Sequence, residues 1–512
     1  MGDGADMTTS EERRLGDRII RELYRDPDYI DDAILNEYVQ TLFQHLLKAA
    51  RERGELSQEL EERFAWEVLL GRDRTVNAFA LPGGYFGVHL GLVGVVNTRD
   101  ELASVLAHEL SHVTQRHISR LMAQQSKQTP LMLGALVLGA LAASKNPEAA
   151  QAMMVGGQAL AVQNQLNFSR DMEREADRVG YGLMAPAGFA PQGFVSMFDK
   201  LQQANRINDN GSWPYLRSHP LSSQRMADMQ SRLPQGAPPA PPPTLEHAMM
   251  AARARVLMRP GVDAWRQWEV EPRGTGFAAR PAVQRAAGWY ASVLSAVQLQ
   301  DVAQAKEGLK GLDAVVQGDI AAMRQARLLA AEVDLAAGDA RAAAARLAPA
   351  SDAAKGSRTA LTAADLGLVP APTNSTGAST NAIASTEPRS VMGTGAGRPE
   401  LVLRTQALLR TGSSVEMTGP LQNWVATYPR DAGAWQLLAG VWQQQGQPLR
   451  AVRAEAEAQA ARYDYAAAVD RFKAGQDLSR KTGAASDYIE ASIIDTRLRA
   501  MQSLLKEQAA ER

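Results

Sequence analysis

Two histidines and a glutamate near residue 110 have the types and the spacing of a metal site. The segment His108-Glu109-Leu110-Ser111-His112 follows the pattern His-Glu-x-x-His. Positions i and i+4 of a helix share one face, so both imidazoles can bind one zinc ion. Glu109 can then act as the general base that takes a proton from the attacking water. The segment predicts a zinc-dependent endopeptidase with one zinc ion per chain, and chance gives this pattern rarely in a chain with seven histidines.

Catalytic zinc needs a third protein ligand, and a downstream segment offers carboxylates for it. The segment reads Ser169-Arg-Asp-Met-Glu173-Arg-Glu-Ala-Asp177. On a helix Glu173 and Asp177 share a face, so one can bind zinc while the other orients a ligand histidine. Glu175 and Asp171 then point elsewhere. On spacing alone, a solvated and charged helix face is the favoured alternative.

The helix that must position His108 has a clear start in the sequence. Thr98 and Glu101 form a capping-box pattern, in which the threonine caps a helix and the glutamate follows three residues later. The apolar residues after this cap recur at helical spacing. They are Leu102, Val105, Leu106, Leu110 and Val113. We therefore expect one continuous helix to carry both histidines.

The residues before this helix predict further helices and one hairpin. Residues 11–70 carry apolar residues at helical spacing. A strand-like stretch follows at 75–80, then a Pro-Gly-Gly turn at 82–84 and a second strand at 85–89. The histidines outside the predicted site have no ligand spacing with a carboxylate, and we assign them structural roles. These are His45, His89, His117 and His247.

Composition limits the classes of protein that this chain can be. Hydrophobic residues make up 45% of its 512 residues and charged residues 22%, as in globular proteins of several domains. The net charge of −1 provides no overall field for nucleic acid or an anionic membrane. Without cysteine, any metal must bind to histidine and carboxylate. Residues 1–10 show no secretory signal, so the protein is either cytoplasmic or lacks its targeting segment here.

The longest apolar run, residues 131–143, is too short to span a bilayer. We interpret it as a core helix or covering flap. The alternative is a lid beside the active site, or an element there that makes peripheral contact with a membrane.

A change of composition near Leu233 predicts a domain boundary. Residues 1–233 form the first expected domain, and the proline-rich residues 234–244 form a linker. Residues 245–512 form an all-α second domain. Within it, residues 351–399 are rich in Ser, Thr, Gly, Ala and Pro and are expected to be a flexible insertion.

Part of the second domain has the period of tetratricopeptide repeats. Gly412 and Gly446 are 34 residues apart and are expected to lie in turns between paired helices. The apolar signature of the repeat is matched by Trp435, Leu438, Ala439 and Trp442. Gly338 marks a weaker unit. Generic alanine-rich helical packing is the alternative.

Taken together, these segments resemble the peptidase family of the CaaX prenyl proteases and the heat-shock protease HtpX, over residues 11–230. The resemblance rests on His-Glu-Leu-Ser-His, followed about 60 residues later by the Ser-Arg-x-x-Glu-x-x-x-Asp segment. It also rests on Glu12-Arg-Arg-Leu-Gly16, Asn77-Ala-Phe-Ala80 with Pro82-Gly-Gly84, and Ser218-His-Pro220 with Arg225. The repeats make the chain most similar to the periplasmic, BepA-like branch. Unlike the prenyl proteases, the chain shows no plausible transmembrane helix.

The resemblance implies an α+β gluzincin-type domain, mostly helical with a small sheet, and it implies roles for several residues. Glu173 becomes the third zinc ligand and Asp177 supports a ligand histidine. The segment Asn77, Ala78, Phe79 and Ala80 becomes an edge strand that pairs with substrate, although a plain core hairpin is equally compatible with the residues.

Two residues near the end of the domain have open roles. His219 is a fourth zinc ligand, a donor to the oxyanion of the reaction, or a solvated loop residue. Arg225 either pairs with a carboxylate of the site or caps a helix.

The expected function is cleavage of misfolded or stalled periplasmic and outer-membrane proteins. The repeats would recruit substrate or the outer-membrane assembly machinery. One alternative is an assembly chaperone or scaffold whose protease is dormant, and another is a cytoplasmic peptidase.

Overall fold

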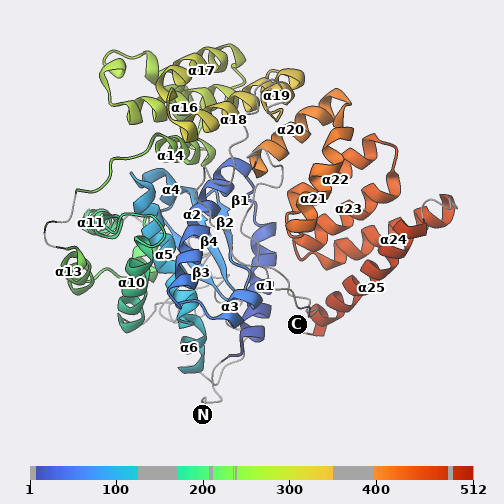
Figure 1. Cartoon of the computed structure of the whole chain (residues 1–512), viewed down its shortest axis with the longest axis horizontal. Helices are drawn as coiled ribbons and strands as arrows, with labels where there is room; N and C mark the ends of the chain where they lie inside the picture. Colours follow the sequence, from blue (N-terminus) through green and yellow to red (C-terminus); the bar gives the residue numbers. More distant parts are fainter. Residues whose placement is uncertain are drawn as a thin grey trace, which may run out of the picture.

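The computed structural model describes residues 7–124, 170–206, 212–234, 236, 239–349, 397–482 and 488–510. The chain is mostly helical, with one small sheet in its N-terminal part (Figure 1). This part consists of α1 (Thr9–Arg25), β1 (Tyr29–Ile30), α2 (Ala33–Glu52), α3 (Gln58–Arg63), β2 (Glu67–Gly71), β3 (Ala78–Leu81), β4 (Tyr85–His89), α4 (Leu90–Val95), α5 (Arg99–Thr114), α6 (His117–Gln124), α10 (Arg170–Met184), α11 (Gln192–Arg206), α12 (Tyr215–Ser218) and α13 (Ser223–Arg232).

The rest of the chain is helical wherever it has regular structure in the described ranges. It consists of α14 (Leu245–Leu257), α15 (Val262–Val270), η1 (Glu271–Arg273), η2 (Phe277–Ala279), α16 (Ala282–Gln298), α17 (Val302–Val316), α18 (Ile320–Ala336), α19 (Ala340–Arg346), α20 (Arg398–Thr411), η4 (Ser414–Met417), α21 (Thr418–Thr427), α22 (Ala432–Gln444), α23 (Pro448–Ala461), α24 (Tyr465–Thr482) and α25 (Tyr488–Ala510). The expectation of a mostly helical protein with a small sheet is confirmed.

The sheet has the strand order β1-β2-β4-β3, with β2 parallel to β4 and the other pairs antiparallel. The predicted hairpin is confirmed as β3 and β4, although β3 begins only at Ala78. The prediction missed β1 and β2, which lie inside the stretch expected to be helical. Val68, Leu69 and Leu70 of β2 are all buried, so this strand lacks the alternation of polar and apolar residues that identifies strands.

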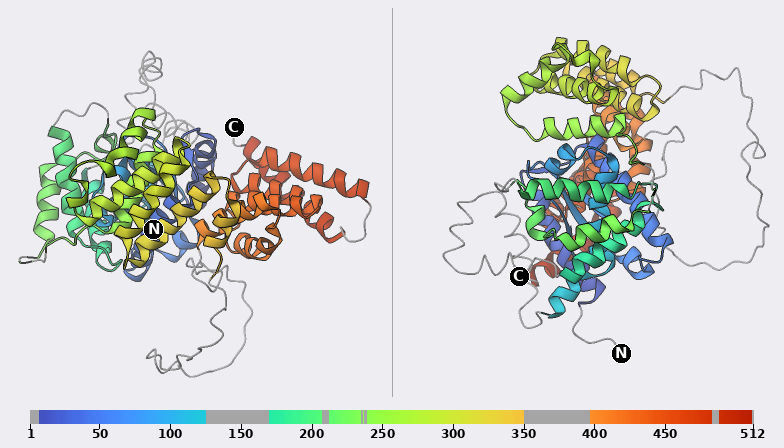
Figure 2. Two further views of the ribbon diagram at one scale, coloured as in Figure 1. Left: turned by 90° about the horizontal axis from the view of Figure 1, so that it is seen from above. Right: turned by 90° about the vertical axis from the view of Figure 1, so that its left-hand side faces the viewer.

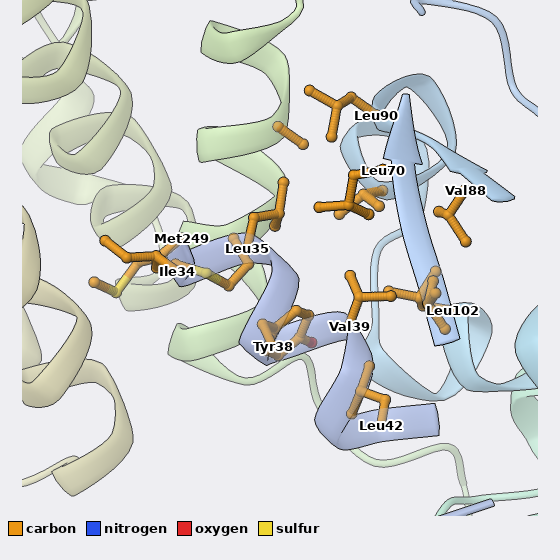
Figure 3. Packing of buried hydrophobic residues seen from close by; sticks show 14 of the residues in the cluster. Ile34, Leu35, Tyr38, Val39, Leu42, Leu70, Val88, Leu90, Leu102 and Met249 are labelled. Carbon is orange, nitrogen blue, oxygen red and sulfur yellow. The ribbon is translucent and has the colours of Figure 1, made fainter. Parts of the chain in front are cut away.

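The core lies between the sheet and the helices that cover it. Figure 3 shows Leu35 and Val39 of α2 facing Leu70 of β2 and Leu102 of α5. Helix α5 packs against α2, α10, α11 and β3, so it is enclosed on most sides. Its first turn begins as predicted, because Thr98 caps the helix and its hydroxyl accepts a hydrogen bond from the Glu101 N–H at 3.1 Å.

The hydrophobic core continues past the predicted boundary near Leu233. Helix α14 packs on α4 and α2, and its Met249 lies beside Ile34 of α2 (Figure 3). His247 of α14 is buried between Tyr38, whose hydroxyl is 2.8 Å from Nδ1, and the Val96 carbonyl, 3.1 Å from Nε2. The views in Figure 2 show α14–α19 stacked directly over the N-terminal part.

Helical hairpins form the C-terminal part, where α22, α23, α24 and α25 each pack on the next (Figure 1). Gly412 and Gly446 lie in turns between helices, with φ of 74° and 66°, as the 34-residue spacing predicts. Helix α20 begins at Arg398, inside the predicted insertion, so the last residues of that prediction are wrong. Pro399 occupies the first turn of the helix, where its missing N–H costs nothing.

Two predicted segments, residues 131–143 and 351–396, lie outside the described residues. Among the described helices, none combines the length and the apolar character needed to cross a membrane.

Candidate metal centre

The two histidines of the His-Glu-x-x-His segment meet on one face of α5. Their Nε2 atoms are 3.0 Å apart, and both side chains are buried. Helix α10 brings Glu173 beside them, with carboxylate oxygens 3.4 Å from His108 Nε2 and 3.5 Å from His112 Nε2. The segment after α12 adds His219, whose Nδ1 is 3.2 Å from His108 Nε2 and 3.1 Å from Glu173 Oε1. These four residues could hold one metal ion.

The bonds behind His108 determine where its proton lies. Asp177, one turn after Glu173 on α10, has an oxygen 2.9 Å from His108 Nδ1. Arg225 of α13 donates two hydrogen bonds to Asp177, at 2.6 and 2.8 Å, and its Nη1 is 2.8 Å from Glu173. A neutral His108 therefore carries its proton on Nδ1 and points an Nε2 lone pair into the cluster. Lone pairs that converge in this way fit a cation between them.

The ionisation of the buried groups also fits a cation. Burial lowers the pKa of His108, but its hydrogen bonds with Asp177 and Glu173 outweigh burial and raise this pKa to about 9. Burial raises the pKa of Asp177, but Arg225 outweighs that effect and holds the pKa below its usual value. The carboxylates thus draw positive charge to this point, and a metal ion would supply that charge.

Glu109 lies next to the cluster, beside His219. Its side chain is buried, and its Oε1 is 3.4 Å from His219 Nε2. Burial raises the pKa of Glu109, which makes this carboxylate a better proton acceptor when ionised. The ring of Tyr215 stacks on His219 with centroids 4.7 Å apart, and Tyr215 is buried. No local pattern in the sequence marks Tyr215, because an aromatic residue four positions before a histidine is not a recognisable signal.

The geometry of this site agrees with the family that the chain matches. The model of peptidase family M48 matches residues 34–233, which include all four candidate ligands. Residues 34–233 are therefore similar to this family.

Proteins that are similar to this chain carry related names. A Vibrio cholerae protein provisionally named a beta-barrel assembly-enhancing protease is 36% identical over 266 residues, which are 51% of this chain and 52% of that protein. The beta-barrel assembly-enhancing protease of Escherichia coli K12 is 28% identical over 324 residues, 62% of each chain. The mitochondrial metalloendopeptidase OMA1 of Saccharomyces cerevisiae is 27% identical over 201 residues, 38% of this chain and 55% of that protein. The chain thus matches about half to three-fifths of the length of these relatives.

A further histidine of the N-terminal part, His117, lies behind the cluster. Its Nδ1 is 2.9 Å from His112 Nδ1, and its Nε2 is 3.1 Å from Glu175 Oε2. We expected only a structural role for His117, and this expectation did not include its contact with a candidate ligand. Glu175 points away from the other carboxylates of α10, as predicted, but it faces His117. The spacing from His112 to His117 is five residues, so the contact could not be read from helical periodicity.

The N-terminal part also places one edge of its sheet next to the helix that carries His108 and His112. Strand β3 is at the end of the strand order, and Val76 just before it exchanges backbone hydrogen bonds with the segment that leads to His219. The Val76 N–H donates to Ser212 at 2.8 Å, and the Tyr215 N–H donates to Val76 at 3.3 Å. The predicted edge residues from Ala78 to Ala80 therefore belong to an edge strand. Asn77 precedes the strand and is buried.

Proposed function

We propose that this protein is a zinc-dependent endopeptidase with His108, His112 and Glu173 as its metal ligands. The spacing of the candidate ligand atoms carries the proposal. Around zinc with bonds of about 2.0–2.1 Å, tetrahedral ligands lie about 3.3 Å apart. Five of the six pairs among the four residues have such atoms 3.0 to 3.5 Å apart. Imidazole and carboxylate ligands at this spacing are typical of catalytic zinc sites.

The reaction divides among residues of the site. His108, His112 and Glu173 would hold the zinc ion, which would supply an acidified water and a polarised peptide carbonyl. Glu109 takes the proton of the attacking water and then delivers it to the leaving amine. Asp177, held by Arg225, keeps the proton of His108 on Nδ1, so that Nε2 remains available as a ligand.

Substrate binds, in this proposal, as an added strand along β3. The His89 N–H donates to the Asn77 carbonyl at 3.0 Å, which makes this pair a hydrogen-bonded one. Along antiparallel strands, hydrogen-bonded pairs alternate with pairs that exchange no hydrogen bonds. Ala78 and Ala80 fall in the second kind of pair, so their backbone N–H and C=O groups point away from β4. An extended peptide can pair with these groups and lie beside Glu109.

His219 serves, in this proposal, as a fourth ligand in the resting enzyme. Its Nδ1 is as close to His108 and Glu173 as those residues are to each other. Four protein ligands close a zinc site and leave no position for water. His219 must therefore move before catalysis, which would restrain the protease until substrate or a partner displaces it.

We further propose that the protein works in the periplasm on misfolded or assembling outer-membrane proteins. The names of two relatives, which refer to beta-barrel assembly, support this substrate class. The helical hairpins after α19 act as tetratricopeptide repeats that recruit substrate or assembly machinery. The 34-residue spacing of Gly412 and Gly446 in equivalent turns supports this role. An assembly scaffold with a dormant protease is the second candidate, and the crowding of the site by His219 favours it in the resting state.

The first prediction tests the enzyme itself. Glu109→Gln should keep about one zinc ion per chain and lose casein cleavage, because it removes the base and no ligand. His108→Ala should lose both zinc and cleavage. Zinc content and cleavage are measured on the same samples. Full activity of Glu109→Gln would exclude the mechanism, whereas zinc-free wild type would exclude the metal centre.

A further inference from the structure

His117 reaches His112 only because the chain breaks between α5 and α6. In a continuous helix, residues five apart point about 140° away from each other. Here α5 ends at Thr114 and α6 starts at His117, and the two imidazole rings lie with centroids 4.9 Å apart. The break therefore folds His117 back against the side of His112 that faces away from the candidate metal ligands.

The break contains a residue in an unfavourable backbone conformation. Arg116 has φ of 53°, which costs a residue with a β-carbon about 1 kcal/mol or more. Its guanidinium is held by the buried carboxylate of Glu12, with Nη2 at 3.1 Å from Oε2. The same Nη2 also bonds Ser119 at 3.2 Å and the Met7 carbonyl. Glu12 opens the Glu-Arg-Arg-Leu-Gly motif, which has no part in the reaction, and its contact holds the turn that presents His117.

The proton positions along this chain of contacts follow from the ligand role of His112. A histidine that binds metal through Nε2 carries its proton on Nδ1. His112 therefore donates from Nδ1, and His117 must accept at its Nδ1, 2.9 Å away. A neutral His117 then carries its proton on Nε2 and donates to Glu175 Oε2 at 3.1 Å. Arg120 donates to the same oxygen at 2.8 Å and keeps it a pure acceptor.

We propose that His117 is a positioning residue for the metal ligand His112, and that Glu175 sets the tautomer of His117 that this requires. The inference rests on the proposed metal centre and extends it. The two ligand histidines are then supported differently, since His108 donates directly to a carboxylate and His112 donates to a neutral imidazole. The neutral His117 shifts less negative charge onto His112 than the carboxylate of Asp177 shifts onto His108. His112 is therefore the weaker electron donor to the metal.

Two variants of His117 separate positioning from packing. His117→Asn places an amide oxygen where Nδ1 accepts, whereas His117→Phe keeps the ring volume and removes the acceptor. Zinc affinity is measured on the full chain by competition with a chelator, and the stability of the zinc-free chain by thermal melting. We expect His117→Phe to bind zinc about 10–100-fold more weakly and His117→Asn to stay within about threefold of wild type. Packing alone predicts the opposite order, because the smaller asparagine leaves a buried gap. Equal losses in both variants, or none in either, would overturn the proposal.

Glu175 gives a second test that leaves the core intact, since its side chain is about one-third exposed. Glu175→Leu removes the acceptor and should weaken zinc binding about three- to tenfold, whereas Glu175→Gln keeps an oxygen and should change it less than about twofold. Asp171→Asn, at a side chain that is 84% exposed on the same helix, is the matched control. In both tests a wild type without zinc at His108 and His112 contradicts the proposed function. If the wild type binds zinc and Glu175→Leu binds it equally tightly, only the proposed roles of His117 and Glu175 are contradicted.

Discussion

At the scale of single residues, the site depends on which nitrogen of each histidine is free. Asp177 and His117 occupy the Nδ1 atoms of His108 and His112, so both Nε2 atoms turn toward Glu173. Arg225 holds Asp177 and Glu173 together. Because an unpaired buried charge is costly, neutralising either carboxylate should weaken the site. The two effects should differ, since Glu173 is itself a candidate ligand and Asp177 contacts the ligand His108.

The carboxylates of α10 provide the second prediction. Glu173→Gln should abolish tight zinc binding, because it removes a ligand oxygen from the cluster. Asp177→Asn should weaken zinc binding about 10–100-fold, which is the usual effect of a residue behind a ligand. Zinc affinity by chelator competition ranks the variants. If Glu175→Gln lost more zinc than Glu173→Gln, the ligand assignment on this helix would be wrong.

His219 provides the third prediction, and its sign separates two roles. As a fourth ligand it blocks the water, so His219→Ala should raise peptide cleavage several-fold while zinc remains bound by three residues. As an oxyanion donor it would instead lower the rate about 10²–10³-fold on removal. Cleavage of an unstructured peptide by equal amounts of zinc-loaded protein distinguishes them. Unchanged activity would leave His219 without either role.

At the scale of elements, the site is assembled by α5, α10 and the segment around α12 against the edge of the sheet. Strand β3 owes its position to Gly87 of β4. A β-carbon at Gly87 would lie 2.1 Å from the ring of Phe79, so only glycine lets this ring lie flat across the sheet. The backbone groups of Ala78 and Ala80 then face away from β4.

The fourth prediction concerns this edge. Ala80→Pro removes an outward N–H and leaves the hydrogen bonds to β4 intact. We expect zinc content to be unchanged and kcat/KM for peptides to fall about five- to tenfold, the worth of one hydrogen bond. Ala80→Val keeps the N–H and serves as the matched control. Equal kcat/KM in the two variants would show that substrate does not pair with β3.

At the scale of the whole molecule, the helices after the proline-rich segment are part of the structure that holds the site. Arg253 of α14 is 2% exposed and pairs with Asp32 at the start of α2 and with Glu332 of α18. Arg398 of α20 likewise pairs with Asp31, and with Asp431 at the start of α22. These two arginines therefore join the residues that precede α2 to helices far along the chain, and their carboxylates would be left unpaired on separation.

The fifth prediction follows from this continuity. A chain that ends at Leu233 should aggregate or melt without cooperativity, because it uncovers the apolar face of α2 and leaves Tyr38 without His247. A chain that ends at Ala348 keeps α14–α19 and should melt cooperatively and bind zinc. Thermal melting and zinc content test both chains. A stable, zinc-binding chain ending at Leu233 would show that the first domain folds alone.

The sequence alone determined the parts of this protein that depend on near neighbours. The pair His108 and His112, the helix start at Thr98 and the shared face of Glu173 and Asp177 all follow from one helical turn. The hairpin of β3 and β4 follows from its turn residues.

Only the tertiary structure decided the contacts between residues whose spacing carries no periodic signal. It placed His117 behind His112, Tyr215 on His219, and α14 against α2. It also showed that β1 and β2 are strands, since their short apolar runs suit a helix as well as a buried strand. Such contacts arise from the path of the whole chain through the core, because the hydrophobic effect favours burial against any apolar partner and does not specify which one.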